Sequence, residues 1–430
     1  MDRRTFTKRS IQAGIALGVF PGLISCKQNG KKEIPVVKLT NGPMQHWFGY
    51  YDKQQVSIDG RYVLGMQLDP SVNYRSPEAG DELRIGMIDL KDTNKWIELG
   101  TSCAWSWQQG CLLQWIPGSE DEIIWNDRQD GQFVSHILNV KTGAKRTLPR
   151  AIYALSPDGR FSVTADFARL QKMRPGYGYA GIVSPYEKVR SPKELGIWKV
   201  DLQSGKEDLI INLAEMAAIP NNGEDLTNYW HWFNHFLVSP DGKRFNYLHR
   251  WRKEFPGAGA ATGGFITRMY TANIDGSDKF CIDPSGDTSH FYWRDPAHIL
   301  AWTRPIGQKW GFYLLEDKTG KYTLTGEESM TENGHNTYIP DKNNEWILND
   351  TYPAQEDRKQ TLYLYHEPTK KKIVLGRFYE PEKCSGEWRC DLHPRCSVKG
   401  NIVTFDSTHE GGIRQMYMMN IDDILNFGTS

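Results

Sequence analysis

The sequence predicts an all-β protein, a seven-bladed β-propeller whose N-terminal strand completes the last blade. Two observations support this prediction: a turn signal related to Ser-Pro-Asp-Gly recurs along the chain, and a short apolar run follows each copy. A third is that the chain contains no long amphipathic helical pattern. Seven units of about four short strands each are typical of a propeller, in which radial repetition leaves little exposed sheet edge.

The repeated turns come at the same place in each unit, and the run after each turn predicts a strand. The seven turns are 57–60, 116–119, 156–159, 239–242, 294–296, 339–342 and 397–400. The runs that follow are 62–66, 122–125, 161–165, 245–248, 298–302, 345–348 and 402–405. Each unit then has a second strand that ends in a second turn, as at 139–143 and 201–205. Runs of this composition between Gly, Pro and Asp are typical of strands.

Ring closure and two insertions complete the architecture. Blade seven ends at 415–421 without a fourth strand, while 36–40 precedes blade one without a partner. Pairing these two segments closes the ring and removes the exposed edge. Insertions at 169–193, in blade three, and at 250–264, in blade four, interrupt the regular period. Long loops on a rigid ring are common places for binding sites.

Composition limits the classes of partner. The 430 residues include 52 basic and 52 acidic side chains, and 39% are hydrophobic. This supports a large packed core and excludes disordered, collagen-like and small disulfide-rich proteins. A neutral chain without a basic stripe is not typical of nucleic-acid binding, so no nucleic acid is expected as a partner.

Residues 1–26 are predicted to be an export signal and stand outside the fold. Arg3 and Arg4 begin a twin-arginine pattern, an apolar stretch covers 11–24, and 23–26 resembles a lipobox that ends in Cys26. Cys26 is therefore the predicted lipidation site, 27–35 a tether and 36–430 the propeller. We expect an exported lipoprotein of the cell envelope, in the periplasm or on the outer-membrane surface, that contacts the membrane through a lipid anchor only. A plain cleaved signal with an incidental Cys26 is the alternative.

Six further cysteines follow, between Cys103 and Cys396. In an oxidising compartment they would form up to three disulfides or remain free thiols, and spacing alone does not choose a pairing.

Four histidines occupy the same register in four consecutive blades. His235, His290, His335 and His393 each precede the second turn residue by five positions, although the chain has only 11 histidines. The first strand of each propeller blade lines the central channel, so these side chains are expected to converge. For a single histidine, a hydrogen-bonded core position is the usual alternative; for the set, a shared site is favoured.

Asp391 adds a carboxylate to this group. It lies two residues before His393, so both side chains point to the same face of a strand. Imidazole and carboxylate groups gathered in a channel are suitable ligands for a divalent ion such as Mn, Zn or Ca, so a metal site is predicted among these residues.

Two aromatic runs surround the histidines in the sequence, at 46–51 and 229–233. Sugar rings stack on aromatic side chains through their C–H faces, which makes His46, Tyr50, Trp230 and His231 candidates for substrate binding. The alternative is that about half of these aromatic side chains form the core between blades.

Blade three contributes further candidates. Tyr153 occupies the neighbouring channel register, and Arg169 and Tyr177 follow in the insertion. A tyrosine and an arginine near histidines would hold and neutralise a carboxylate, so Tyr153 and Arg169 are catalytic candidates and Tyr177 a substrate-binding one. A structural role is an equal alternative.

Segments 288–293, 334–336 and 391–394 resemble the corresponding blades of the oligogalacturonide lyases, which are metal-dependent seven-bladed propellers. The resemblance covers roughly the last 200 residues in histidine order and register. It implies that His290 is the catalytic base and that His335 and His393 bind the metal, with Asp391 where the family has another histidine. The family's glutamine ligand has no clear counterpart, since Trp388 falls nearby.

The chain is also similar in plan to the ulvan lyase propellers, which place His, Tyr and Arg around a channel. That similarity implies that Tyr153 and Arg169 have the roles of the tyrosine and the arginine of those enzymes. The blade-two histidines of those enzymes are not evident here, where the region contains Gln108, Gln109, Asn126 and Asp127.

Together these resemblances imply a polysaccharide or oligosaccharide lyase that cleaves a uronic-acid-containing glycan by metal-assisted β-elimination. A base removes the C5 proton and the bond from C4 to the glycosidic oxygen breaks. His290 is the expected base, and His235, Tyr153 and Arg169 are further catalytic candidates. The alternative is a non-catalytic glycan- or protein-binding propeller lipoprotein. A hydrolase would need two facing carboxylates, for which no convincing pair stands out.

Overall fold

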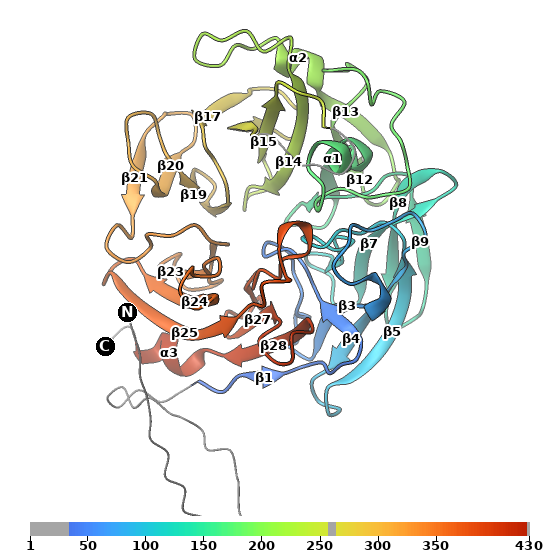
Figure 1. The fold of residues 1–430 in the computed structure, drawn as a ribbon, viewed down its shortest axis with the longest axis vertical. Helices are drawn as coiled ribbons and strands as arrows, with labels where there is room; N and C mark the ends of the chain where they lie inside the picture. Colours follow the sequence, from blue (N-terminus) through green and yellow to red (C-terminus); the bar gives the residue numbers. More distant parts are fainter. Residues whose placement is uncertain (1–33, 257–263, 428–430) are drawn as a thin grey trace, which may run out of the picture. The chain divides into compact units, whose positions relative to one another are not determined.

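The computed structural model describes residues 34–256 and 264–427, apart from the side chains of 426 and 427. The export signal, most of the tether and Cys26 lie outside the described residues. The described residues belong to one compact unit. Within it, seven four-stranded sheets follow one another around a ring, as Figure 1 shows. The predicted seven-bladed β-propeller is confirmed.

Blades one to three use consecutive strands. Blade one contains β2 (Gln45–Trp47), β3 (Tyr62–Leu68), β4 (Leu83–Asp89) and β5 (Lys95–Ser102). Blade two contains β6 (Gln114–Trp115), β7 (Glu122–Gln129), β8 (Gln132–Asn139) and β9 (Lys145–Leu148). Blade three contains β10 (Ala154–Leu155), β11 (Phe161–Ala165), β12 (Gly196–Asp201) and β13 (Glu207–Asn212). The pairs in all three sheets are antiparallel.

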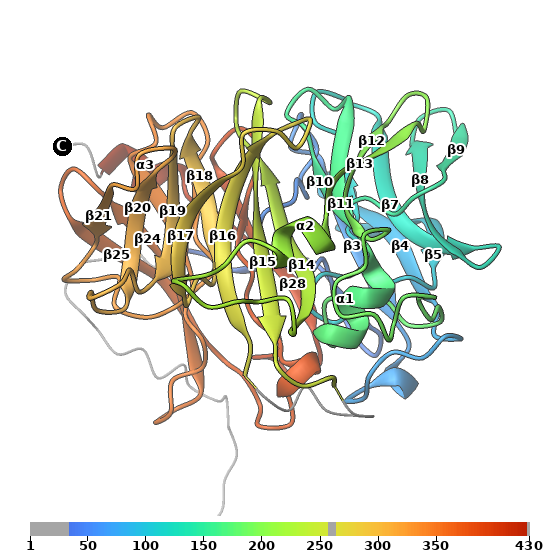
Figure 2. The ribbon, with the colours of Figure 1, turned by 90° about the horizontal axis from the view of Figure 1, so that it is seen from above.

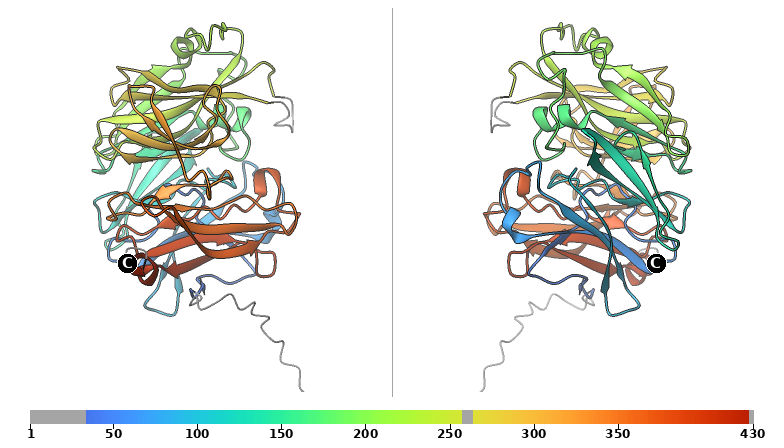
Figure 3. Two further views of the ribbon diagram at one scale, coloured as in Figure 1. Left: turned by 90° about the vertical axis from the view of Figure 1, so that its left-hand side faces the viewer. Right: turned by 90° about the vertical axis from the view of Figure 1, so that its right-hand side faces the viewer.

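Blades four to six follow the same order. Blade four contains β14 (Trp230–Val238), β15 (Arg244–Arg252), β16 (Ile266–Asn273) and β17 (Phe280–Gly286). Blade five contains β18 (Phe291–Asp295), β19 (His298–Thr303), β20 (Gly311–Glu316) and β21 (Tyr322–Thr325). Blade six contains β22 (Thr337–Tyr338), β23 (Trp346–Asn349), β24 (Lys359–His366) and β25 (Lys371–Tyr379). Figure 3 shows the blades from two sides of the ring.

Blade seven joins the two ends of the described chain. It contains β26 (Arg395–Cys396), β27 (Ile402–Ser407), β28 (Gln415–Asn420) and the N-terminal β1 (Val37–Lys38). Strand β1 pairs antiparallel with β28, with Val37 opposite Met418. The predicted ring closure is therefore confirmed, and it removes the edge that β28 would otherwise expose.

The repeated turns have a shared chemical basis. At the turn before β11, the Ser156 hydroxyl donates to Asp158 at 2.6 Å and accepts from the backbone N–H of Phe161 at 3.1 Å. Gly159 adopts φ of +69°, which an L side chain rarely does. The same hydroxyl contacts recur at Ser57 and Ser239. Local hydrogen bonds thus start the second strand of these blades, which explains why the sequence signal predicts the fold.

Short helices interrupt the strands. They are η1 (Pro70–Val72), α1 (Phe167–Met173), α2 (Leu213–Ala217), η2 (Gly386–Trp388) and α3 (Asp422–Phe427). The blade-three insertion, expected to be a loop, thus begins within α1, whose N-terminus is capped by the Asp166 side chain at the Arg169 N–H. In Figure 2, α1 and the blue helix η1 lie at the same edge of the ring. Among the described residues, no helix is both long and apolar enough to span a bilayer.

The six cysteines of the propeller are all free thiols in this structure. Cys111, Cys384 and Cys390 are buried. The fold is held by apolar packing between blades, in which large aromatic side chains such as Trp47, Trp125 and Trp346 are almost wholly buried.

Candidate functional site

The four register-matched histidines lie around one tyrosine in the channel. The ring of Tyr51 lies between 5.2 and 6.5 Å, centroid to centroid, from the rings of all four. The rings of His290 and His335 are 4.2 Å apart, and those of His335 and His393 are 4.3 Å apart. Each histidine comes from a different blade, so radial repetition brings together residues that are far apart in the sequence.

Two of these histidines have a left-handed backbone. His235 has φ of +53° and His393 has φ of +43°. His235 also lies at a β-bulge, where the register between β14 and β15 shifts from Asn234 to Phe236. A non-glycine residue in this region costs about 1–2 kcal/mol, and bulges commonly redirect a side chain near a functional site.

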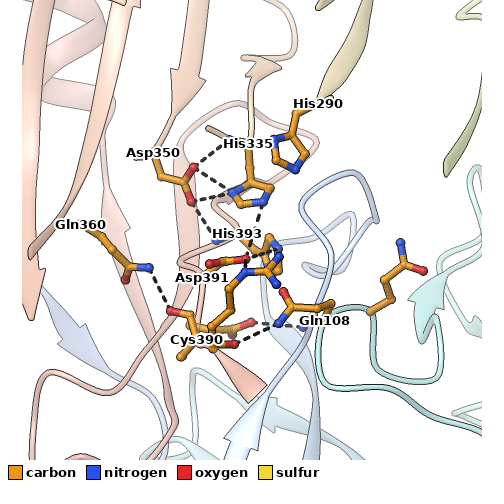
Figure 4. Close-up of polar contacts among 12 residues, drawn as sticks. Gln108, His290, His335, Asp350, Gln360, Cys390, Asp391 and His393 are labelled. Carbon is orange, nitrogen blue, oxygen red and sulfur yellow. Dashed lines mark hydrogen bonds and ion pairs between the residues drawn. The ribbon is translucent and has the colours of Figure 1, made fainter. Parts of the chain in front are cut away.

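His335, Asp391 and His393 form a compact set of potential metal ligands (Figure 4). Their ligand atoms all lie within 4.8 Å of one another. Asp391 Oδ2 is 4.0 Å from His335 Nε2 and 3.8 Å from His393 Nε2, and each side chain is at most 4% exposed. His335 Nε2, His393 Nε2 and Asp391 Oδ1 are buried and have no hydrogen-bond partner. Because buried polar atoms are rarely left without a partner, these residues fit a bound divalent ion.

Asp350 fixes the orientation of this set, and sequence reasoning missed it. It follows β23 directly, and its carboxylate accepts from His335 Nδ1 at 2.9 and 3.0 Å. It also accepts from the backbone N–H groups of His335 and His393, at 2.7 and 3.2 Å. A carboxylate cannot donate, so the proton of His335 lies on Nδ1 and the lone pair of Nε2 remains free. A polar residue directly after a buried strand was the available signal.

No glutamine completes the set at the position that the family resemblance suggested. The Trp388 indole N–H donates to the carbonyl of Lys383, and an indole offers no lone pair to a metal. Gln108 donates to the carbonyls of Glu387 and Arg389, and Gln360 to that of Cys390 (Figure 4). These two amides therefore support the segment that carries Asp391.

His290 stands beside the metal-ligand set, and in the described part of the chain its Nε2 has no hydrogen-bond partner. The Asn333 side-chain oxygen is 3.0 Å from His290 Nδ1, so Nδ1 carries the proton when that oxygen accepts it. Burial, followed by the neighbouring His335, lowers the pKa of His290 well below its usual value. The ring is therefore neutral at pH 7 and presents Nε2 as a base.

An open cavity of about 280 Å³ adjoins these residues. It is lined by Tyr50, Arg174, Tyr177, His235, Arg250 and His290, among others. The stacked indoles of Trp302 and Trp310 lie at its wall, with centroids 6.0 Å apart, and Trp310 is 43% exposed. Such an exposed indole next to polar groups is a suitable surface for a sugar ring. Neither tryptophan was among the predicted site residues.

The cavity carries two positive charges without acidic partners. Within the described ranges, neither Arg174 nor Arg250 forms an ion pair, and Arg174 Nε is buried without a hydrogen-bond partner. Burial, and next Arg174, lowers the pKa of Arg250 to about 10, so that its guanidinium is still charged at pH 7. Unpaired guanidinium groups in a cavity favour an anionic ligand.

Arg389 connects the cavity to the metal-ligand set. Its guanidinium lies 2.8 Å from Asp391 Oδ2 and donates to the Tyr177 hydroxyl at 2.9 Å. Burial alone would raise the pKa of Tyr177, but Arg389 and Arg174 outweigh it and lower that pKa. Tyr177 thus lies at the cavity wall with Arg389 at its hydroxyl and Arg174 over its ring.

The structure places Arg169 and Tyr153 away from the cavity. The Arg169 guanidinium donates to the backbone carbonyls of His231, Val189 and Arg190, at 2.6, 3.0 and 2.5 Å. These bonds leave it no means to neutralise a substrate carboxylate, so it anchors the blade-three insertion instead. The Tyr153 hydroxyl accepts from Gln109 at 2.5 Å, and its ring lies beneath Lys53 in the channel.

His46, Trp230 and His231 also lie outside the cavity lining. His46 contacts Gln67 and Gln415 at the side of blade one. Trp230 packs on Phe255, outside the cavity lining. Both ring nitrogens of His231 are bonded within blade four, to His249 and to the Leu226 carbonyl. Of the five residues predicted to bind substrate, only Tyr50 and Tyr177 line the cavity, because strand parity and local packing decide which aromatic side chains face it.

Comparison with known proteins adds the fold relationship. No protein-family model and no curated protein matches the sequence. Among solved structures, the oligogalacturonate lyase from Vibrio parahaemolyticus superposes with a TM-score of 0.63 at 16% identity, over 91% of this chain and 95% of that one. An oligogalacturonate lyase in complex with manganese gives a TM-score of 0.63 at 14% identity, over 91% and 94%. The chain therefore has the propeller fold of these lyases.

Proposed function

We propose that this protein is a lyase that cleaves a uronic-acid-containing oligosaccharide or polysaccharide by metal-assisted β-elimination. The observation that carries the proposal is the buried His335–Asp391–His393 set, in which His335 Nε2, His393 Nε2 and Asp391 Oδ1 have no hydrogen-bond partner. His290, with Nδ1 held by Asn333, lies next to this set. The likeness to oligogalacturonate lyases, one of them solved with manganese, supports it. Two imidazoles and a carboxylate suit Mn or Zn better than Ca, which prefers oxygen ligands.

Each part of the site has a task in this reaction. A divalent ion held by His335, Asp391 and His393 would act as a Lewis acid toward the uronate carboxylate and increase the acidity of the C5 proton. Arg250 and Arg174 attract the anionic sugar into the cavity and neutralise its charge. His290 Nε2 removes the C5 proton, and Asn333 keeps the accompanying Nδ1–H in place. Trp310 and Trp302 offer a surface for the sugar ring.

The direct test is the ultraviolet absorbance of the C4–C5 double bond that elimination creates. Purified protein is incubated with pectic, ulvan-type, rhamnogalacturonan and glycosaminoglycan fragments, with and without chelator. We expect absorbance to rise on at least one of these glycans, to stop after chelation, and to return when Mn is added. His290→Ala should abolish the rise, whereas His298→Ala, a partly exposed histidine on β19, should not.

A different outcome would favour the non-catalytic alternative. If wild-type protein binds Mn and glycan but produces no absorbance on any substrate, the site is a binding site rather than a catalytic one. If neither Mn nor glycan binds, the proposed metal- and glycan-binding site is wrong.

The cellular location is a second part of the proposal. We propose export through the twin-arginine pattern at Arg3 and Arg4 and acylation at Cys26. Cys26→Ala should move the protein from the membrane fraction to the soluble fraction of the cell envelope. Retention of the variant in the membrane fraction would contradict lipidation at this residue.

A further inference from the structure

Three arginine side chains gather at the blade-four wall of the cavity, and we call them the arginine cluster. Arg250 and Arg252 stand two positions apart on β15, so they share one face of the strand, and Arg174 follows α1 as its C-terminal cap. The guanidinium carbons of Arg174 and Arg250 lie 5.1 and 4.8 Å from the ring centre of Phe265. That of Arg252 lies 5.4 Å from the ring centre of Trp232, and the two aromatic rings are 5.7 Å apart. Blades three and four thus bring three cations around one pair of rings.

No ion pair in the described chain compensates the arginine cluster. Within residues 34–256 and 264–427, none of its three members lies in an ion pair, and the sequence of 257–263 contains no acidic residue. Asp287, an acidic residue of the cavity lining, is paired with Arg304 at 2.7 Å. Glu387, which lies near Arg174, accepts from the Ser76 hydroxyl at 2.8 Å, and burial raises its pKa. Three like charges at the edge of a cavity are costly unless an anion binds there.

Buried donors in the arginine cluster have no acceptor. Arg174 Nε, Arg252 Nε, Arg252 Nη1 and Trp232 Nε1 are buried without a hydrogen-bond partner in the described part of the chain, and Arg252 is only 4% exposed. Arg250 donates through Nε to the Thr267 hydroxyl at 3.2 Å, and its two terminal nitrogens have no acceptor among the described residues. Burial, and next the charge of Arg174, lowers the pKa of Arg252. Because buried polar atoms are rarely left unpaired and every unpaired atom here is a donor, the cluster fits an anionic ligand.

The arginine cluster extends away from the reacting position along β15. Asn234, beside His235 in the bulge, pairs with Leu248, and Arg250 and Arg252 stand two and four positions further along the strand. Arg250 lines the cavity, whereas Arg252 lies beyond its lining, about 7 Å further on. A sugar unit covers a distance of this order, so a glycan whose uronate stands at the channel histidines presents its neighbouring sugar to Arg252. One uronate carboxylate neutralises one charge and leaves the rest of the cluster for a second anion.

We propose, on the basis of the lyase function above, that the arginine cluster is a second anion site, which binds a singly charged oxyanion on the sugar next to the reacting uronate. A sulfate ester and the carboxylate of a second uronate share this chemistry. Arg252 is then the residue that selects substrates carrying such a group, since Arg174 and Arg250 also serve the reacting uronate. No covalent bond is made or broken at this site.

A matched set of uronate oligosaccharides tests the inference. The neighbouring sugar carries a sulfate ester, a carboxylate or only neutral hydroxyls, and kcat/KM is measured from the absorbance of the elimination product. Wild-type protein should prefer at least one charged member over the neutral one by about 10-fold or more, the range of a charged hydrogen bond. The charged member with the larger preference identifies the source of the anion.

Variants at position 252 connect this preference to the arginine cluster. Arg252→Gln should remove most of the preference, and Arg252→Lys only part of it, because lysine keeps the charge but not the planar fork. The matched control is Arg190→Gln, which should keep the whole preference. Arg190 is exposed and lies 5.7 Å from the ring centre of Trp230, but its guanidinium donates to the Asn228 carbonyl. Mn binding measured by calorimetry shows whether each variant is folded.

The outcomes separate this inference from the function it rests on. If wild-type protein eliminates all members with equal kcat/KM, or if Arg252→Gln keeps the wild-type preference, the second anion site is overturned and the lyase function stands. If wild-type protein eliminates no member, the lyase function fails, and the selective role of Arg252 fails with it. Should Arg252→Gln not fold, Arg252→Lys decides the question, and an undiminished preference in that variant would likewise overturn the site.

Discussion

Two clusters of buried histidines in the same ring differ in whether their ring nitrogens have hydrogen-bond partners. In blade four, His231 Nδ1 lies 3.0 Å from His249 Nε2, and His249 Nδ1 lies 3.1 Å from Arg268 Nε. The remaining nitrogen of His231 bonds to a backbone carbonyl at 2.8 Å. In the channel, by contrast, Nε2 of His335 and Nε2 of His393 are buried without a partner.

This difference distinguishes a structural histidine from a ligand better than burial does. Both clusters are almost wholly buried, and burial lowers the pKa of His249 and of His393 well below the usual value. Only the channel cluster leaves lone pairs unused, at a cost of about 1–3 kcal/mol for each unsatisfied group. A bound ion would compensate that cost, which is why we assign the metal to the channel and a purely structural role to the blade-four cluster.

The largest effect should appear when one histidine of each cluster is replaced by alanine and the two variants are compared. His335→Ala should abolish Mn binding and lower kcat/KM of the lyase reaction by about 10²-fold or more, because several kcal/mol of charge stabilisation are lost. His249→Ala should leave both quantities unchanged and lower the free energy of unfolding. Calorimetric titration with Mn and denaturant unfolding give the two readouts. Equal loss of Mn binding in the two variants would contradict the assignment of the metal to the channel cluster alone.

Asp350, the second carboxylate of the channel, gives a further test of the metal site because it orients His335. Asp350→Asn should weaken Mn binding by about 10–100-fold, the usual effect of removing a group that orients a ligating histidine. The matched control is Asp127→Asn, because Asp127 also faces a histidine, His136 at 3.3 Å, but lies in blade two. The control should bind Mn as wild type does. A stronger effect at Asp127 than at Asp350 would argue against the channel site.

Arg250 and Arg169 allow the same comparison for cations. Arg250 has no ion pair in the described ranges, whereas the guanidinium of Arg169 is bonded to backbone carbonyls. Arg250→Ala should raise KM by about 10-fold or more, since a charged hydrogen bond contributes about 1.5–3 kcal/mol. Arg169→Ala should lower the melting temperature with little change in KM, because its bonds go to backbone carbonyls. Steady-state kinetics and thermal melts on the two variants check this. An increase in KM for Arg169→Ala larger than that for Arg250→Ala would reverse the assignment.

The smallest expected effect is the acid sensitivity of the structural histidine. Burial lowers the pKa of His231 to about 4, whereas an unfolded histidine has its ordinary value of 6.5. The unfolded chain therefore binds more protons between these two values, and stability falls as the pH falls through this window. Urea unfolding at pH 7 and pH 5 should show the decline, and His231→Gln should reduce it. A stability that increases toward pH 5 would contradict this account.

Local chemistry explains how much of the fold the sequence predicts. The turns at Ser57, Ser156 and Ser239 contain within a few residues the hydroxyl, carboxylate and glycine that they need. Together with the related turns of the other blades, their recurrence predicts the blade number, and the two unpaired segments 36–40 and 415–421 predict the ring closure. The histidine register is visible for the same reason, since each histidine stands at a fixed distance from its turn.

The site is only partly predictable, because its partners come from distant parts of the chain. Asp350 acts on His335 across 15 positions and on His393 across 43, and nothing near it in sequence indicates either contact. Arg169 was expected in the cavity, but carbonyl groups that follow it by 20 positions and more occupy its guanidinium. Which arginine remains free is a property of the packed blades.

The sequence by itself thus determined the seven-bladed ring, its closure by the N-terminal strand and the row of four histidines, because short-range turn chemistry and a regular repeat encode them. Tertiary structure alone decided which nitrogen atoms remain without partners, which cations line the cavity and which carboxylates orient His235 and His335. Those properties depend on hydrogen bonds between residues far apart in the chain, within a blade for His335 and between blades for His235, and no local pattern connects these residues.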